Sequence, residues 1–434
     1  MSRYRNIKKI WQFRLGGSSS NVIFKNMMLM TAGTLIGRLA GFAALPIISR
    51  LYPPESFGSL AVFMALITII TPVSTFYATA IPLPKRDSLA LNVVMLSFFT
   101  LLCVLFVCGG LLALAANDIF AFFNAPSITE WWPMLILGIA FSGIFQILLQ
   151  WSTRKKAFST ISWALAFQAL LGAGLKIFLG VIGVINSGLL IGGVAQSGAG
   201  VAQLGRKLLH DSSKRLHNLS IKSLTRAARR FSDFALFRLP SQFLLAFTGQ
   251  ALLLFSAVLF DVDTTGQIAL AMSVLTFPVS LLGRNIGQAY YGEVAAIGRN
   301  DLPRVRVLTA SVVKRIFLVA SPVAFAFLVG GPFFFTWVFG SQWELAGQIA
   351  SASAPYVLAS LASIPVVHVL SVIGRQKDYL RINVMRSIWT VGLFSIAHHF
   401  DLDALTTVSL YYGVLTIHLG GVLIRVFRLL NTPK

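Results

Sequence analysis

Residues 89–115 read LALNVVMLSFFTLLCVLFVCGGLLALA and contain no charged side chain. A helix needs about 20 consecutive, mostly apolar residues to cross a hydrocarbon core about 30 Å thick, and this stretch exceeds that length. Backbone groups cannot stay unpaired in lipid, and so long an apolar run favours a helix over the strand of a barrel. The stretch therefore predicts a membrane-spanning helix.

The rest of the 434-residue chain has the same character. It is 56% hydrophobic and 12% charged, with a mean hydropathy of +0.78, whereas soluble domains carry about 25% charged residues. Comparable segments predict about 12 transmembrane helices in an all-α polytopic membrane protein. They lie at 24–48, 57–82, 89–115, 131–151, 160–182, 186–204, 236–260, 266–291, 311–337, 345–373, 379–398 and 404–427.

The basic residues predict how the chain is oriented in the membrane. Most of the 36 Lys and Arg residues fall on alternate connections, including the N-terminal stretch and residues 205–235, whereas the opposite loops hold acidic residues and only Arg50. Positive charge marks the cytoplasmic side, so we expect cytoplasmic N and C termini. The formal charge of +22 is not gathered on one soluble domain, and we expect no nucleic-acid partner.

The chain also repeats itself weakly. Leu51, Tyr52, Gly58 and Met64 recur 208 positions later as Leu259, Phe260, Gly266 and Met272, and Gly41 maps onto Gly249. This pattern predicts two parallel six-helix lobes around a central cavity. The predicted parts are an N-terminal lobe at 1–204, with a basic cytoplasmic N-terminus at 1–22; a basic amphipathic cytoplasmic linker at 205–235; and a C-terminal lobe at 236–434. The linker is expected to lie along an anionic leaflet, or else to be a solvated charged loop.

Catalytic chemistry is not evident in the sequence. Arg206-Lys207 stand where a phosphate-binding loop needs Lys followed by Ser or Thr, and no convincing set of acid, base and nucleophile appears. The longest outer connection, near 116–130, is too short for a catalytic domain. His368 and His418 lie inside spans, where each is either a proton-coupling site or a partner in a hydrogen bond between helices. We expect no enzyme, no metal and no cofactor.

Cations embedded in the spans predict the substrate. Arg38, Lys176 and Arg284 lie in apolar stretches that hold no Asp or Glu, and Arg238 lies at the inner edge of a span. A cation in hydrocarbon costs about 2.5–3.5 kcal/mol on insertion scales, so it is kept where it faces a wet cavity or an anion. Lys176 and Arg238 could instead reach the membrane surface through their long side chains. An Arg fork suits phosphate, so we expect these four residues to bind an anionic group in the cavity.

Several motifs resemble those of one family. Residues 34–42 (TLIGRLAGF), 49–58 (SRLYPPESFG) and 286–293 (IGQAYYGE) are similar to bacterial polysaccharide flippases of the Wzx or polysaccharide-transporter type. The resemblance implies a flippase that moves an undecaprenyl-pyrophosphate-linked oligosaccharide, an O-antigen, capsule or exopolysaccharide repeat unit, across the bacterial inner membrane by alternating access. It implies membrane lipids, a glycan polymerase and a chain-length regulator as further partners.

Two branches of the same superfamily fit less well. In the lipid II flippase, a second Arg would fall at Ala44, and two further spans are expected. Multidrug antiporters commonly use a membrane carboxylate for cation coupling, and the predicted spans contain none. An ion-coupled exporter of small amphiphiles or drugs, and a membrane enzyme of glycan assembly, remain as alternatives. No sequence motif identifies which glycan is carried, which energy source is used or what the oligomeric state is.

Overall fold

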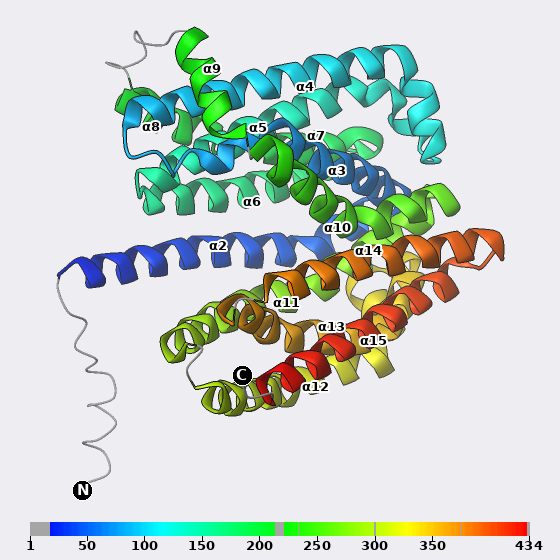
Figure 1. The fold of residues 1–434 in the computed structure, drawn as a ribbon. Helices are drawn as coiled ribbons and strands as arrows, with labels where there is room; N and C mark the ends of the chain where they lie inside the picture. The colour runs from blue at the N-terminus through cyan, green and yellow to red at the C-terminus, as the bar shows by residue number, and fades with distance from the viewer. Residues whose placement is uncertain (1–17, 213–220, 233, 299–300, 374, 432–434) are drawn as a thin grey trace, which may run out of the picture.

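A computed structural model of the chain describes residues 18–212, 221–232, 234–298, 301–373 and 375–431. All regular secondary structure in these ranges is helical (Figure 1). The long helices are α2 (Ser18–Leu51), α3 (Pro54–Ser74), α4 (Asp87–Phe122), α5 (Trp132–Arg154), α6 (Phe158–Val181), α7 (Ile185–Gly198), α10 (Leu239–Leu259), α11 (Val262–Ile297), α12 (Leu302–Phe339), α13 (Glu344–Val372), α14 (Gln376–His399) and α15 (Ala404–Asn431). Shorter ones are α8 (Val201–Ser212), α9 (Ile221–Arg230), 3-10 helices at Phe76–Ala80, Pro126–Trp131 and Ser341–Trp343, and a π-helical turn at Phe234–Arg238.

The predicted spans correspond to these helices, with breaks in two of them. In the predicted span 57–82, α3 ends at Ser74 and a 3-10 helix follows at Phe76–Ala80. The predicted span 186–204 is interrupted at Gly200, whose φ of +83° favours glycine, so α7 and α8 are separate helices. By length and apolar composition alone, eight of the described helical segments can cross a membrane. Of the remaining helices in predicted spans, α7 is short, and α2, α11 and α14 carry charged residues. The all-helical polytopic membrane fold is confirmed, while the orientation of the termini and the lobe boundaries stay predictions.

The predicted linker is partly described. Of the basic N-terminus predicted at 1–22, residues 1–17 lie outside the described residues, as do 213–220 and 233 of the linker. Helix α9 packs against α4 with Ala227 buried, and the Ser223 hydroxyl donates a hydrogen bond to Asn92 Oδ1 at 3.1 Å. Arg226, Arg229 and Arg230 are exposed on the other side of α9. This part of the linker is therefore an amphipathic helix docked on the bundle.

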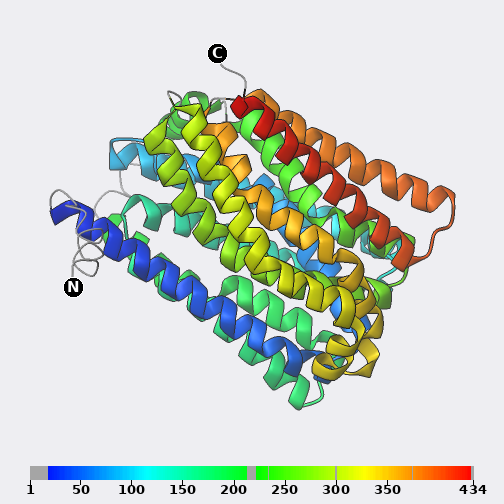
Figure 2. The same ribbon diagram turned by 90° about the horizontal axis from the view of Figure 1, so that it is seen from below.

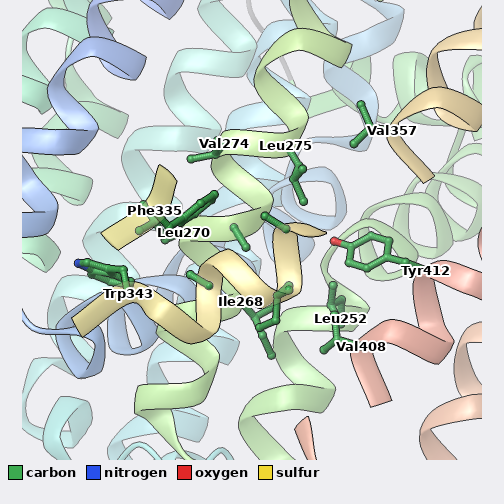
Figure 3. Close-up of a cluster of buried hydrophobic side chains, with 14 of the residues drawn as sticks. Leu252, Ile268, Leu270, Val274, Leu275, Phe335, Trp343, Val357, Val408 and Tyr412 are labelled. Atoms are coloured by element: carbon green, nitrogen blue, oxygen red, sulfur yellow. The ribbon is translucent and has the colours of Figure 1, made fainter. Parts of the chain in front are cut away.

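One hydrophobic cluster joins the two halves of the chain. It combines Ile48, Tyr52 and Phe57 from the first half with residues of the second half, including Trp343. The members labelled in Figure 3 belong to the second half and come from α10, α11, α12, α13, α15 and the 3-10 helix at Ser341–Trp343. The Trp343 indole N–H donates to the Ser49 carbonyl at 2.9 Å, which satisfies a buried polar group within the cluster. The two halves therefore share a core at the end of the molecule that holds the turn between α2 and α3, which is the predicted outer end.

A pair of glycines makes this junction close. A Cβ added at Gly58 would strike the Val262 carbonyl of the other half, and one added at Gly266 would strike the Pro54 carbonyl. Pro54 and Val262, like Gly58 and Gly266, are 208 positions apart. The contact is therefore reciprocal, as at a two-fold interface. Only residues without a side chain allow α3 and α11 to approach so closely.

The opposite end of the molecule has separate cores. A cluster built on α4, α5 and α8 draws only on residues before 235, and one built on α11, α12, α13 and α15 draws only on residues after 285. The largest hydrophobic cluster shared by the two halves therefore includes the predicted outer end, whereas these two clusters at the predicted cytoplasmic end each draw on one half.

Candidate functional site

A cavity of about 500 Å³ lies among α2, α6 and α7. Helix α2 runs alongside α6, as Figures 1 and 2 show, and Gly37 lies against Ala166 and Ala169 of α6. Small residues allow this close approach of the two helices. The cavity contains two of the embedded cations, Arg38 and Lys176, together with Gln196.

The Lys176 side chain points to α7. Its Nζ donates a hydrogen bond to Gln196 Oε1 at 3.0 Å, and its aliphatic part passes over Gly192, where a Cβ would strike it. The Tyr52 hydroxyl donates to the Lys176 carbonyl at 2.8 Å and ties the backbone of α6 to the end of α2. The Lys176 ammonium group is thus hydrogen-bonded to the neutral Gln196 inside the bundle and does not extend to the membrane surface.

The Arg38 side chain reaches across to the second half of the chain. Its Nη1 donates to the Ser280 carbonyl of α11 at 2.7 Å. One turn away, Phe42 stacks on Phe277 with 4.0 Å between ring centroids. A guanidinium has five N–H donors in a planar fork, a geometry that matches phosphate oxygens. A ligand on Arg38 would therefore contact both halves of the molecule at once.

The other predicted site residues lie elsewhere or are not described. The backbone of Arg284 belongs to α11, one turn beyond Ser280, but its side chain lies outside the described part of the structure. Arg238 is exposed at the start of α10 and does not line the cavity of Arg38 and Lys176. The side chain of His368 is also outside the described part. The structure therefore brings together Arg38 and Lys176 of the predicted set.

His418 lies in a different region, on α15, where it lines a cavity between α15 and α14. It lines an apolar cavity of about 770 Å³ with Arg381 and Arg425, and its buried Nε2 has no hydrogen-bond partner among the described residues. Close by, Asp378 is 5% exposed and accepts a hydrogen bond from Arg425 Nη2 at 2.6 Å. Arg386, whose Nε is also buried, lies beside His418.

Asp378 lies just before the predicted span 379–398, whereas α14 begins at Gln376 and includes it. Its charge is compensated by Arg425 of α15 and by neighbouring side chains, which a hydropathy profile does not reveal. Asp378 is a buried carboxylate that the sequence analysis missed, but Arg425, Arg375 and Arg381 all lie within 4.0 Å of it.

A second cavity of about 420 Å³ adjoins the first. Gln196 lines both cavities. Residues of α3, α5, α6, α7 and α10 form the second cavity, and no Asp, Glu, Lys, Arg or His is among its described lining residues. The sequence analysis did not identify Gln196. The signal that could have revealed it is a polar amide side chain within an otherwise small and apolar stretch of the predicted span.

The comparisons with known proteins agree with this architecture. A family model described as "Polysaccharide biosynthesis protein" matches residues 47–347. No curated protein sequence matches the chain at a significant level. An inward-facing multidrug resistance MATE family transporter of the MOP superfamily is similar in structure, with a TM-score of 0.64 and 15% identity, over 94% of this chain and 99% of that one. A mutant of the MATE transporter VcmN of Vibrio cholerae gives a TM-score of 0.55 and 15% identity, over 96% and 99% of the two chains.

Proposed function

Because the chain belongs to the polysaccharide biosynthesis protein family and has the fold of MOP-superfamily transporters, we propose that it is a flippase for a lipid-linked glycan. The cargo is an undecaprenyl-pyrophosphate-linked oligosaccharide, and the membrane is the bacterial inner membrane. The protein moves this cargo between leaflets by alternating access and carries out no reaction on it.

The observation that supports this proposal most strongly is the cavity lined by both Arg38 and Lys176. Two cations inside a membrane protein are costly, and an anionic ligand offsets that cost. The Ser280 carbonyl, which accepts a hydrogen bond from Arg38, and the Gln196 amide oxygen, which accepts one from Lys176, are both neutral groups. Hydrogen bonds from a cation to phosphate oxygens are roughly twice as strong as neutral ones, so a pyrophosphate competes well for both side chains.

The position of Arg38 links binding to movement of the lobes. Since Arg38 extends from α2 to α11, a pyrophosphate on its guanidinium lies at the boundary between the two halves. Arg284, four residues after Ser280 on α11, is the candidate for a ligand from the second half, and Arg238 is a candidate for first contact at the predicted cytoplasmic side. A cargo held from both sides favours the state in which the lobes close around it.

A reconstituted flipping assay tests the proposal. In proteoliposomes containing a fluorescent undecaprenyl-pyrophosphate-linked disaccharide, Arg38→Ala combined with Lys176→Ala is expected to lower the initial flipping rate about 100-fold or more, because two charge-assisted contacts are lost. Lys155→Ala is the matched control. It removes a cation that pairs with Asp87 at 2.8 Å outside the cavity, and it should leave the rate unchanged. Full activity of the double variant, at equal protein content, would contradict the proposed site.

The ion-coupled exporter is the second candidate, and the environment of His418 is the observation that favours it. His418 has a buried, unbonded Nε2 beside an apolar cavity, as a protonatable site in a drug pathway would require. The exporter has less support, because the buried carboxylate nearby, Asp378, is already paired with Arg425. Drug efflux that depends on His418, in cells whose surface glycan is unaffected by loss of the protein, would establish the exporter instead.

A further inference from the structure

The second cavity has the side chains of a carbohydrate site. Along one face of α3, Thr68, Thr71 and Thr75 each donate a hydrogen bond of 2.7 Å to the carbonyl four residues earlier. Their hydroxyl protons are therefore engaged, and their oxygens remain available as acceptors. This row of acceptors suits a ligand that brings many hydroxyl donors.

Three glutamines around the same cavity add both donors and acceptors. Gln146 of α5 and Gln242 of α10 make no side-chain hydrogen bond within the described part of the chain, and Gln168 Nε2 donates only a long bond, 3.4 Å, to the Ser197 carbonyl. Each primary amide carries two donor protons and an acceptor oxygen. Phe76 and Phe145 supply apolar surface between these polar groups, a combination typical of small-ligand pockets of this size.

The relation between the two cavities suggests what the second one binds. Gln196 forms part of both, and its Oε1 already accepts from Lys176, which leaves its NH₂ group as a donor. In a lipid-linked glycan, the first sugar is bonded directly to the distal phosphate of the pyrophosphate. A ligand with its pyrophosphate beside Lys176 therefore has its first sugar beside Gln196.

We propose that the second cavity binds the sugar joined to the pyrophosphate and selects a neutral sugar rich in hydroxyl or amide groups. The inference rests on the proposed flippase function and adds the substrate class to it. A sugar carboxylate in this cavity would lose its hydration and find no cation among the described lining residues, which disfavours acidic sugars at this position. Neutral hydroxyl and amide groups find partners in the threonines and glutamines.

Binding measurements on the full chain in nanodiscs separate this inference from the proposed function. The three probes are undecaprenyl pyrophosphate alone, the same lipid carrying one N-acetylhexosamine, and the same lipid carrying one hexuronic acid. Thr68→Val combined with Gln146→Leu should weaken binding of the N-acetylhexosamine lipid about ten-fold and leave binding of the sugar-free lipid unchanged. The unmodified protein should bind the hexuronic acid lipid about ten-fold more weakly than the N-acetylhexosamine lipid.

A control for the threonine change exists on the repeat-related helix. Thr276 of α11 donates to the Met272 carbonyl at 2.7 Å, just as Thr68 donates to that of Met64, but it lies outside this cavity. Thr276→Val should therefore bind all three probes like the unmodified protein. If the double variant proves unstable, Gln242→Leu, which changes a different helix, provides the same test.

The possible outcomes distinguish the two proposals. Equal weakening of the sugar-bearing and sugar-free lipids by Thr68→Val with Gln146→Leu, or no weakening of either, would overturn the sugar site. Equal affinity for the two sugars would overturn the preference for a neutral one. Failure of the protein to bind any of the three lipids, or indifference of all three to Arg38→Ala with Lys176→Ala, would instead refute the proposed function.

Discussion

Helices α2 and α3 correspond to α10 and α11 at an offset of 208 residues, and the two pairs differ in an instructive way. The positions that bring the halves together are alike, because Gly58 and Gly266 each admit a carbonyl of the other half. The position that faces the cationic cavity is not alike, since Arg38 corresponds to Ala246. The scaffold is repeated, whereas the cation at this position belongs to the first half only.

The same difference appears further along the second pair of helices. Thr68 and Thr276 are equivalent and make equivalent hydrogen bonds, but Thr71 corresponds to Val279 and Thr75 to Gly283. Helix α3 ends at Ser74 and continues as a short 3-10 helix, while α11 runs on to Ile297. The row of threonine acceptors therefore exists in the first half alone. A symmetric fold can bind an asymmetric cargo because its side chains have diverged while the close backbone contacts are kept.

The largest effect is expected when the cation is moved to the equivalent helix. Arg38→Ala combined with Ala246→Arg keeps the total charge, but Ala246 packs against the cluster of Ala65, Ile69 and Leu254. An arginine in that apolar contact should lower stability by about 3 kcal/mol or more, and it should not restore flipping. Thermal unfolding in detergent and the flipping assay measure the two effects. Recovery of flipping in the swapped variant would mean that the halves are interchangeable.

A smaller effect is expected at the shared glycine contact. Gly58→Ala and Gly266→Ala each introduce a methyl group against a backbone carbonyl of the other half, so each should destabilise the closed junction by about 1–3 kcal/mol. Gly41 and Gly249, the equivalent pair on α2 and α10, have nothing within 4 Å of an added Cβ. Alanine at these two positions should be neutral or slightly stabilising. Distances between spin labels at the predicted outer end should lengthen only in the first two variants, and equal behaviour of all four would disprove the reciprocal contact.

The smallest effect is expected at Arg50, which has no charged counterpart because Val258 is its equivalent. Arg50 Nη2 donates to the Trp337 carbonyl at 2.7 Å and Nε donates to that of Val338 at 3.2 Å, so the side chain caps the C-terminal end of α12. Since the site is exposed, Arg50→Ala should weaken the closed end by only about 1 kcal/mol. The same spin-label distances should show a modest shift toward opening. A shift as large as that of Gly58→Ala would show that this cap, and not the glycine contact, dominates closure.

The positions of the candidate residues show how far sequence reasoning extends. A cation fourteen residues into the first predicted span has no short route to water, so a cavity could be expected beside Arg38. Lys176 was ambiguous, because the direction of a long side chain depends on its neighbours. In the structure Gly192 leaves room for its aliphatic part, and Gln196 Oε1 accepts a hydrogen bond from its Nζ. Asp378 was left outside the predicted spans because its burial depends on the pairing with Arg425 of α15, which a hydropathy profile of α14 does not contain.

The composition and charge pattern of the sequence are enough to show that the chain is a helical membrane protein, where most of its spans lie, and which few cations lie deep within them. These properties follow from the cost of placing charges and unpaired backbone groups in hydrocarbon, a cost that acts on each segment separately. The folded chain alone shows that Arg38 and Lys176 share a cavity, that Gln196 lines both this cavity and a second one, and that the two halves meet at Gly58 and Gly266. Those arrangements depend on how helices far apart in the chain pack together, and packing is set by shape complementarity that no single segment contains.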